Sequence, residues 1–186
     1  MNEFITIDFE TAKHSRESAI AVGLVKYHDY QPVDTFYSLI CPPKLYIRPD
    51  FTGIHGLTID DVRDAPSFAY IWESEAREFI GGTILAAHNA AFDMRVLRAT
   101  LEHYEIPVPV ISYFCSYILS KRVWPEFYSH SLVNLAKQFD IHYNAHNALD
   151  DAMTCGKLVE MAAIKTESRI SLEELFEAVG LELKSL

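Results

Sequence analysis

The stretch EFITIDFET, residues 3–11, is the clearest strand of the chain, and the fold and the site both depend on it. Residues 3–9 alternate and are rich in β-branched side chains, which predicts a buried strand. Successive side chains of a strand point to opposite faces, so Asp8 and Glu10 share one face, about 7 Å apart. Two carboxylates on a buried strand resist desolvation and repel each other, and a divalent cation removes both penalties. The alternative is a strand that emerges at the surface with two solvated acids.

The segments around this strand predict an α/β fold. Further strands are expected at 18–28, 33–41, 83–87 and 108–114. Helices are expected at 67–80, 90–104, 115–122, 131–139, 148–163 and from Ser171 onward. Three strands therefore come first, and two more then alternate with helices. This order is typical of a mixed five-stranded sheet flanked by helices.

The composition indicates one globular domain. A chain of 186 residues is long enough for one sizeable core, and 49% hydrophobic residues exclude disorder. No apolar run approaches the length of a membrane span and no secretion signal is present, so we expect a cytoplasmic protein without membrane contact. The three cysteines, Cys41, Cys115 and Cys155, form no CxxC pair and are expected as core thiols in a reducing compartment.

The charge excludes a protein that grips long stretches of duplex. The chain has 16 Lys and Arg against 26 Asp and Glu, a net charge of −10, and Lys121 and Arg122 form only a small basic block. A protein that binds many phosphates presents a basic stripe and gains affinity from counterion release. An acidic protein can still handle a few phosphates at a strand end if bound divalent cations reverse the local field.

Two further positions hold polar groups that can serve a metal site. Asp93 lies in the first turn of the helix expected at 90–104, where the helix dipole stabilises a carboxylate with or without a function. His146 precedes the helix expected at 148–163, and it is either a site residue or a surface loop histidine like His142.

Helical periodicity separates the two acids at the start of the helix 148–163. Asp150 lies on the face of Thr154 and Lys157, a polar face on which it can pair with the lysine. Asp151 lies on the face of Cys155 and Leu158, which should turn inward. An inward carboxylate needs a partner, so Asp151 is the better candidate for a metal ligand.

These carboxylates can converge on one point beside the first strand. An all-oxygen cluster of this kind favours Mg²⁺ or Mn²⁺ over Zn²⁺. The sequence offers no Cys/His zinc set, no Gly-rich phosphate loop and no GxSxG elbow. The composition and the motifs therefore favour a site built on divalent cations.

Three segments, taken in order, resemble the motifs of the DEDDh family of 3′–5′ exonucleases. They are DFET at 8–11, HNAAFD at 88–93, and His146 separated by four residues from Asp151. Within that family the chain is similar to the proofreading epsilon subunits of bacterial DNA polymerase III and their stand-alone relatives. Further matches are GIHGLT at 53–58 and SHSLVNLA at 129–136, so the resemblance spans roughly residues 3–163. It implies an RNase H-like fold, which agrees with the sheet inferred from the pattern.

The resemblance implies a role for each site residue. Asp8, Glu10 and Asp151 would hold one of two Mg²⁺ or Mn²⁺ ions, and Asp8 and Asp93 the other. His146 would take a proton from the attacking water. The residues expected to contact the terminal nucleotide are Thr11, His55, Leu57, Asn89 and Phe92. Leu57 is either a wedge against the terminal base or a core residue under a loop.

The expected function is the release of nucleoside 5′-monophosphates from the 3′ end of DNA, in proofreading or repair. One alternative is the same chemistry on RNA, as 3′-end trimming or clearance of short oligonucleotides. Another is a non-catalytic interaction module on the same fold. We expect an exonuclease domain at 1–165 and a short helical tail at 166–186. The expected partners are a single-stranded or frayed 3′ end of DNA or RNA and a DNA polymerase subunit. The tail after Ser171 either docks on that subunit or packs its apolar stripe on its own domain.

Overall fold

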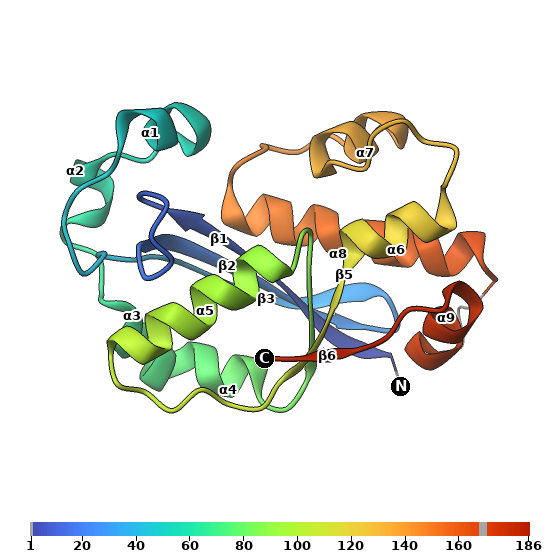
Figure 1. Cartoon of the computed structure of the whole chain (residues 1–186), viewed down its shortest axis with the longest axis horizontal. Helices are drawn as coiled ribbons and strands as arrows, with labels where there is room; N and C mark the ends of the chain where they lie inside the picture. The colour runs from blue at the N-terminus through green and yellow to red at the C-terminus, as the bar shows by residue number, and fades with distance from the viewer. Residues whose placement is uncertain (1, 168–170) are drawn as a thin grey trace.

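Strand β1 (Glu3–Thr11) lies inside the sheet and pairs on both of its edges. It is antiparallel to β2 (Ala19–His28) and parallel to β4 (Ile84–Ala87). The other strands are β3 (Gln31–Leu39), β5 (Ser112–Cys115) and β6 (Lys184–Ser185). The order across the sheet is β3-β2-β1-β4-β5-β6 (Figure 1). This computed structural model describes residues 2–167 and 171–186 of the chain.

The sheet is mixed, as the sequence predicts, and it differs from the expected five strands in two details. The sixth strand, β6, has two residues, which is too short for any alternation to reveal it. Strand β5 begins at Ser112 instead of 108. Pro107 and Pro109 lack the N–H groups that a paired strand would need, so the segment before β5 stays outside the ladder.

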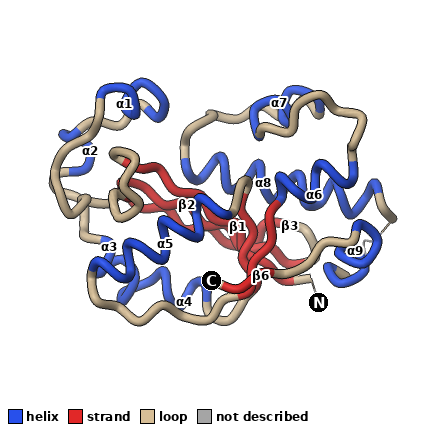
Figure 2. The backbone as a smooth tube through the Cα atoms, in the orientation of Figure 1, coloured by secondary structure: helices blue, strands red, loops and turns tan. Residues whose placement is uncertain are grey.

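Helices cover both faces of the sheet. They are α1 (Pro49–His55), α2 (Ile59–Val62), α3 (Phe68–Ile71), α4 (Arg77–Ile80), α5 (Ala91–His103), α6 (Ser116–Val123), α7 (Leu132–Gln138), α8 (Ala148–Lys165) and α9 (Leu172–Val179). A π-helical turn at Trp72–Ala76 joins α3 to α4, so the helix expected at 67–80 is continuous. Figure 2 shows the strands crossing the middle of the molecule, with α3, α4 and α5 on one side and α6, α7 and α8 on the other.

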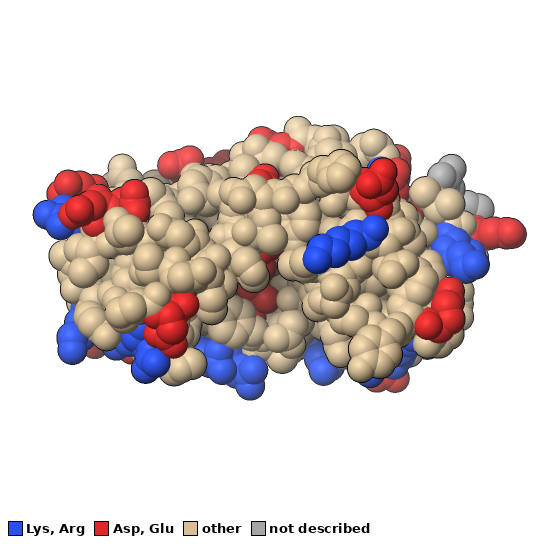
Figure 3. Space-filling model, turned by 90° about the horizontal axis from the view of Figure 1, so that it is seen from above, with Lys and Arg blue, Asp and Glu red and all other residues tan. Residues whose placement is uncertain are grey.

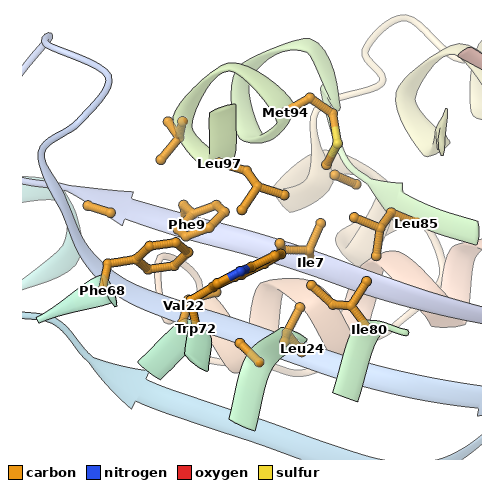
Figure 4. Close-up of a cluster of buried hydrophobic side chains, with 14 of the residues drawn as sticks. Ile7, Phe9, Val22, Leu24, Phe68, Trp72, Ile80, Leu85, Met94 and Leu97 are labelled. Atoms are coloured by element: carbon orange, nitrogen blue, oxygen red, sulfur yellow. The ribbon is translucent and has the colours of Figure 1, made fainter. Parts of the chain in front are cut away.

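The alternation of β1 divides the core into two parts. Ile5, Ile7 and Phe9 pack with the side chains of α3 and α5, including Phe68 and Leu97 (Figure 4). Phe4 points the other way and packs against α8 and α9. The even-numbered side chains of β1 therefore face α8, and Asp8 and Glu10 are among them. This parity is what directs both carboxylates toward the start of α8.

The C-terminal segment completes the sheet and the second core. Leu172, Leu175 and Phe176 of α9 are buried, and the Phe176 ring meets the Phe114 ring of β5 at 4.9 Å. The backbone N–H of Leu186 donates to the carbonyl oxygen of Ile111. The apolar stripe of the tail thus packs on its own sheet.

The three cysteines are free thiols. Cys155 is buried, as the sequence predicts, whereas Cys41 and Cys115 are half-buried. Over 2–167 and 171–186, no helix combines the length and the apolar character that crossing a membrane requires.

We expect Gly156→Ala to destabilise the fold. A Cβ atom at Gly156 would overlap the ring of Tyr27, which is 2% exposed and donates a hydrogen bond to the carbonyl oxygen of Met153 at 3.0 Å. Overpacking of this kind costs roughly 1–3 kcal/mol, and the better helix propensity of alanine offsets at most about 1 kcal/mol. Urea unfolding measures the free energy. Gly82→Ala is the matched control, because a Cβ there meets nothing within 4 Å. Equal stability of the two variants would contradict this close packing of α8 on β2.

Candidate active site

The start of α8 brings Asp151 to the carboxylates of β1. The side chain of Asn147 caps the helix by accepting hydrogen bonds from the N–H groups of Leu149 and Asp150. Asp151 is 8% exposed, and its Oδ2 accepts a hydrogen bond from the N–H of His146 at 3.1 Å. Its other oxygen, Oδ1, is buried without a hydrogen-bond partner in the described part of the chain. A buried carboxylate oxygen without a donor is a site that a cation would stabilise.

Asp93 reaches the same place from the other side of β1. The pairing of β1 with β4 ends at Thr6, so later N–H groups on that edge of β1 need other partners. Asp93 Oδ1 accepts a hydrogen bond from the Phe9 N–H at 3.2 Å. The carboxylate, which is 1% exposed, is therefore fixed to the strand between Asp8 and Glu10.

The structure brings together all five residues that the motifs predict. Glu10, His146 and Asp151 each offer a ligand atom, and these atoms lie within 4.8 Å of one another. Asp8 and Asp93 are not in this tight group, but each is close enough to other site carboxylates for the charges to raise its pKa. Figure 3 views the molecule from above, relative to Figure 1. Near the middle of this view, Asp and Glu atoms lie at the floor of a hollow.

Burial disfavours the ionised form of every carboxylate in the site, and repulsion by other site carboxylates adds to it at Asp8, Glu10 and Asp93. Burial raises the pKa of Asp8 well above its ordinary value, and the charges of Asp93 and Asp151 add to the effect. Burial raises the pKa of Glu10 to about 8 and that of Asp93 to about 8, with Asp151 contributing to both. Burial raises the pKa of Asp151 to about 6 although His146 opposes it. The donor set, mostly oxygen with one imidazole, fits a divalent cation that would relieve this repulsion.

The metal-free protein should therefore lose stability as the pH rises. Because the folded-state pKa of Asp93 is raised, its contribution is fully present near pH 4 and is lost as the pH passes about 8. In EDTA we expect the free energy of unfolding to fall by a few kcal/mol between pH 5 and pH 8.5, at 1.36 kcal/mol per pKa unit. Mg²⁺ should restore it at pH 8.5. Urea titrations at each pH measure the effect, and a metal-free stability that increases toward pH 8.5 would contradict the repulsion.

A cavity of about 290 Å³ opens beside Glu10 and His146. His55 and Leu57, which the resemblance predicts as contacts of the terminal nucleotide, both line this cavity. His55 Nδ1 accepts a hydrogen bond from the Leu57 N–H at 3.0 Å, which fixes the turn after α1. Leu57 also packs against a small apolar cluster around Ile47. It therefore both supports the loop and lines the cavity.

The other three predicted substrate contacts lie outside this cavity. Thr11 is 5% exposed at the irregular end of β1. Phe92 packs on the core beneath the guanidinium of Arg16, 5.1 Å from its ring centre. Asn89, with a φ of 72°, lines a different cavity together with Tyr117.

Tyr143 and His88 are site residues that the motifs did not single out for a role. Burial and the charge of Asp151 raise the pKa of the Tyr143 hydroxyl, which shows that Tyr143 lies beside the carboxylate. His88 is bonded to Ser116 Oγ at 2.9 Å and to the His130 carbonyl oxygen at 2.8 Å, and burial lowers its pKa to about 4. A neutral His88 therefore ties the end of β4 to the segment 116–130. His88 stands inside the HNAAFD motif, which was the available signal for it, whereas Tyr143 lies outside every matched motif.

One prediction about α8 is wrong. Asp150, Thr154 and Lys157 were expected to share a polar face, but Thr154 is 2% exposed. The Lys157 Nζ pairs with Glu160 Oε2 at 2.6 Å, and the described residues show no pair with Asp150. The reason is that α8 packs against β1, β2, α6 and α7, so more than one of its faces is covered.

The mixed sheet flanked by helices is an RNase H-like fold, and the carboxylates at the end of its inner strand β1 form a group that could hold a divalent cation. A family model described as exonuclease matches residues 5–159. The DNA polymerase III subunit epsilon of Treponema pallidum (strain Nichols) is 34% identical over 160 residues, covering 83% of this chain and 74% of that protein. The DNA polymerase III PolC-type of Bacillus subtilis (strain 168) is 31% identical over 186 residues, covering 95% of this chain and 13% of that protein.

A solved structure, exonuclease X in complex with 5′ overhanging duplex DNA, matches with a TM-score of 0.73 at 24% identity, over 95% of this chain and 99% of that chain. This likeness agrees with the fold. The chain belongs to the exonuclease family. It spans about an eighth of the PolC-type relative and about three quarters of the epsilon subunit.

Proposed function

We propose that this domain shortens DNA strands from the 3′ end, one nucleotide at a time, in proofreading or repair. The observation that carries the proposal is the convergence of Asp8, Glu10, Asp93 and Asp151 at the end of β1, with one buried oxygen of Asp151 left without a donor. Four carboxylates in one place repel the phosphates of a substrate unless cations intervene. The family membership and the similarity to a polymerase III epsilon subunit support the same conclusion.

The carboxylates would hold two Mg²⁺ or Mn²⁺ ions. Asp8, Glu10 and Asp151 would bind the first, and Asp8 and Asp93 the second. When bound, such a pair activates water and neutralises the charge that develops on the attacking and leaving oxygens. The assignment of Asp8 to both ions follows the family resemblance, and the raised pKa of Asp8 under the charges of the other three carboxylates is consistent with a central position.

His146 would act as the general base. Its ring nitrogen lies within 4.8 Å of a Glu10 and an Asp151 oxygen, and the side chain is exposed, so water and substrate can reach it. Imidazole is the side chain whose ordinary pKa lies closest to neutral pH. The φ of 66° at His146 and the bond from its N–H to Asp151 hold the residue at the rim of the site.

The cavity lined by His55 and Leu57 would hold the terminal nucleotide. At about 290 Å³ it is at the small end of ligand cavities, which suits one nucleotide and not a duplex. We assign Leu57 to the base of that nucleotide and His55 to the wall of the pocket. Thr11, Asn89 and Phe92 stay proposed contacts of the substrate outside this cavity.

The polymerase III relatives also suggest a partner. The epsilon subunit of Treponema pallidum is a subunit of DNA polymerase III, and the Bacillus subtilis relative is itself a polymerase III protein. We propose that this domain works beside a DNA polymerase subunit. Copurification of the tagged chain with a polymerase from its own cells would support the association, and its absence at native expression would count against it.

The direct test is degradation of 5′-labelled single strands of DNA and RNA of one sequence, with Mg²⁺ and with EDTA. We expect a ladder of products that shorten from the 3′ end in Mg²⁺, a higher rate on DNA, and no products in EDTA. Release of the labelled 5′ nucleotide first, or cutting that persists in EDTA, would contradict the mechanism. A higher rate on RNA would assign the domain to RNA 3′ ends instead.

A further inference from the structure

Two cavities outside the active site meet at Tyr117. One, of about 580 Å³, is lined by Asn89, Tyr117, Arg122 and Lys184 among others. The second, of about 520 Å³, is lined by Tyr117, Lys121, Tyr128 and His130 among others. Asn89 directly precedes the segment that starts α5, the helix that carries Asp93. The two cavities share Tyr117 of α6, and the first of them reaches Asn89, which lies four residues before Asp93 in the sequence.

The Tyr117 ring is packed against two histidine rings. The rings of His88 and His130 meet it nearly at right angles, at 80° and 81°, with centre distances of 5.7 and 6.2 Å. His88 is itself bonded to Ser116 and to the His130 backbone. Tyr117 is nevertheless 36% exposed. A fixed aromatic ring with an accessible surface is a preorganised place for a planar ligand to stack.

Tyr128 and Lys121 extend this surface. Tyr128 is fully exposed, which gives the fold no reason of its own for an aromatic side chain there. The Lys121 Nζ lies 5.7 Å from the centre of the Tyr117 ring. Across the described ranges Lys121 makes no ion pair, so its charge is available to an anion. In a chain of net charge −10, a lysine beside exposed aromatic rings is a local positive charge that can attract a phosphate.

Exposed aromatic rings interleaved with cations are the arrangement by which proteins bind single-stranded nucleic acid, because every base has a face that can stack. We propose that Tyr117, Tyr128 and Lys121 form a platform for the bases and phosphates of single-stranded DNA upstream of the terminal nucleotide. This inference rests on the proposed function. It adds that the domain prefers ends with several unpaired nucleotides and discriminates against dinucleotides, which are too short to reach the platform.

The test compares kcat/KM on a DNA dinucleotide and on a 12-mer of single-stranded DNA. For the wild type we expect a higher value on the 12-mer. Tyr128→Ala should lower the ratio of 12-mer to dinucleotide about tenfold, through KM and not kcat, and Tyr128→Phe should restore it. Lys121→Ala should lower the ratio and reduce the salt dependence of KM by about one phosphate contact, a slope change of about 0.7. Tyr70→Ala is the matched control, because Tyr70 is 66% exposed and lines none of these cavities.

The outcomes separate the two proposals. If the wild type cleaves both substrates and the Tyr128→Ala and Lys121→Ala variants keep its length preference, the platform is refuted and the exonuclease stands. If Tyr128→Ala affects kcat on the dinucleotide as strongly as on the 12-mer, Tyr128 acts on the active site and the platform is also refuted. If the wild type degrades neither substrate from the 3′ end, the proposed function fails, and the platform with it.

Discussion

Asp8→Ala should reduce 3′–5′ degradation of single-stranded DNA by at least about 10³-fold in Mg²⁺. Asp8 is the carboxylate on which the charges of Asp93, Asp151 and Glu10 all act, so its removal takes a ligand from both proposed ions. Metal ions contribute several kcal/mol of charge stabilisation to such reactions, and each 1.36 kcal/mol is a factor of ten in rate. Single-turnover degradation of a 5′-labelled 12-mer at saturating enzyme measures the chemical step.

The same substitution should leave the fold intact and make the metal-free protein more stable. Burial and repulsion hold the pKa of Asp8 far above its ordinary value, so its ionised form is unfavourable in the folded state. Asp8→Asn, which keeps the shape, should behave in the same way. Asp64→Ala is the matched control, because Asp64 is an exposed acid and should change neither property. A folded Asp8→Ala protein that degrades DNA at the wild-type rate would refute the metal assignment.

The convergence of β1 and α8 could be predicted from the sequence because it depends on two short-range periods. The period of two along β1 places Asp8 and Glu10 on one face, and the period of 3.6 along α8 separates Asp151 from Asp150. Both inferences hold in the structure: the even-numbered side chains of β1 face α8, and Asp151 is buried while Asp150 is not. The pattern could not reveal that Thr154 is covered as well, because that requires knowing how many elements pack around α8.

The contacts that fix the site depend on where other elements stop, which no local pattern shows. The Asp93 bond to the Phe9 N–H joins residues 84 apart in sequence, and it exists because β4 is too short to pair with that part of β1. The left-handed backbone at His146 and the position of Tyr143 arise in a loop without periodicity. The motif resemblance pointed to His146, while the neighbourhood of Tyr143 became visible only in three dimensions.

The cavity beside Glu10 shows the same division. His55 and Leu57 follow a match in the sequence, and both line the cavity beside Glu10. Asn89 and Phe92 stand in the same motif as Asp93, yet helical geometry and the turn before α5 direct them elsewhere. A motif places its residues in one neighbourhood, and only the backbone decides which of them share a cavity.

His146→Ala should slow the chemical step by about 10²–10⁴-fold, the usual loss when a general base is removed. The exposed ring lies within 4.8 Å of ligand oxygens of Glu10 and Asp151, where it can accept a proton from water or bind a cation itself. The two roles predict different results. A base changes kcat and its dependence on pH and leaves the Mg²⁺ requirement nearly unchanged, whereas a ligand changes the Mg²⁺ concentration needed for half-maximal rate.

His142→Ala is the matched control for this variant. His142 lies four residues earlier in the same loop and is 92% exposed. It pairs with Asp140 at 3.3 Å and not with a carboxylate of the site. It should keep the wild-type rate at every pH. For His146→Ala the rise in rate with pH that the base imposes should disappear, while the rate at saturating Mg²⁺ stays low. A pH–rate profile identical to that of the wild type would assign the proton to another group. A rate recovered fully by high Mg²⁺ would make His146 a metal ligand, because the proton acceptor would then still be present in the variant.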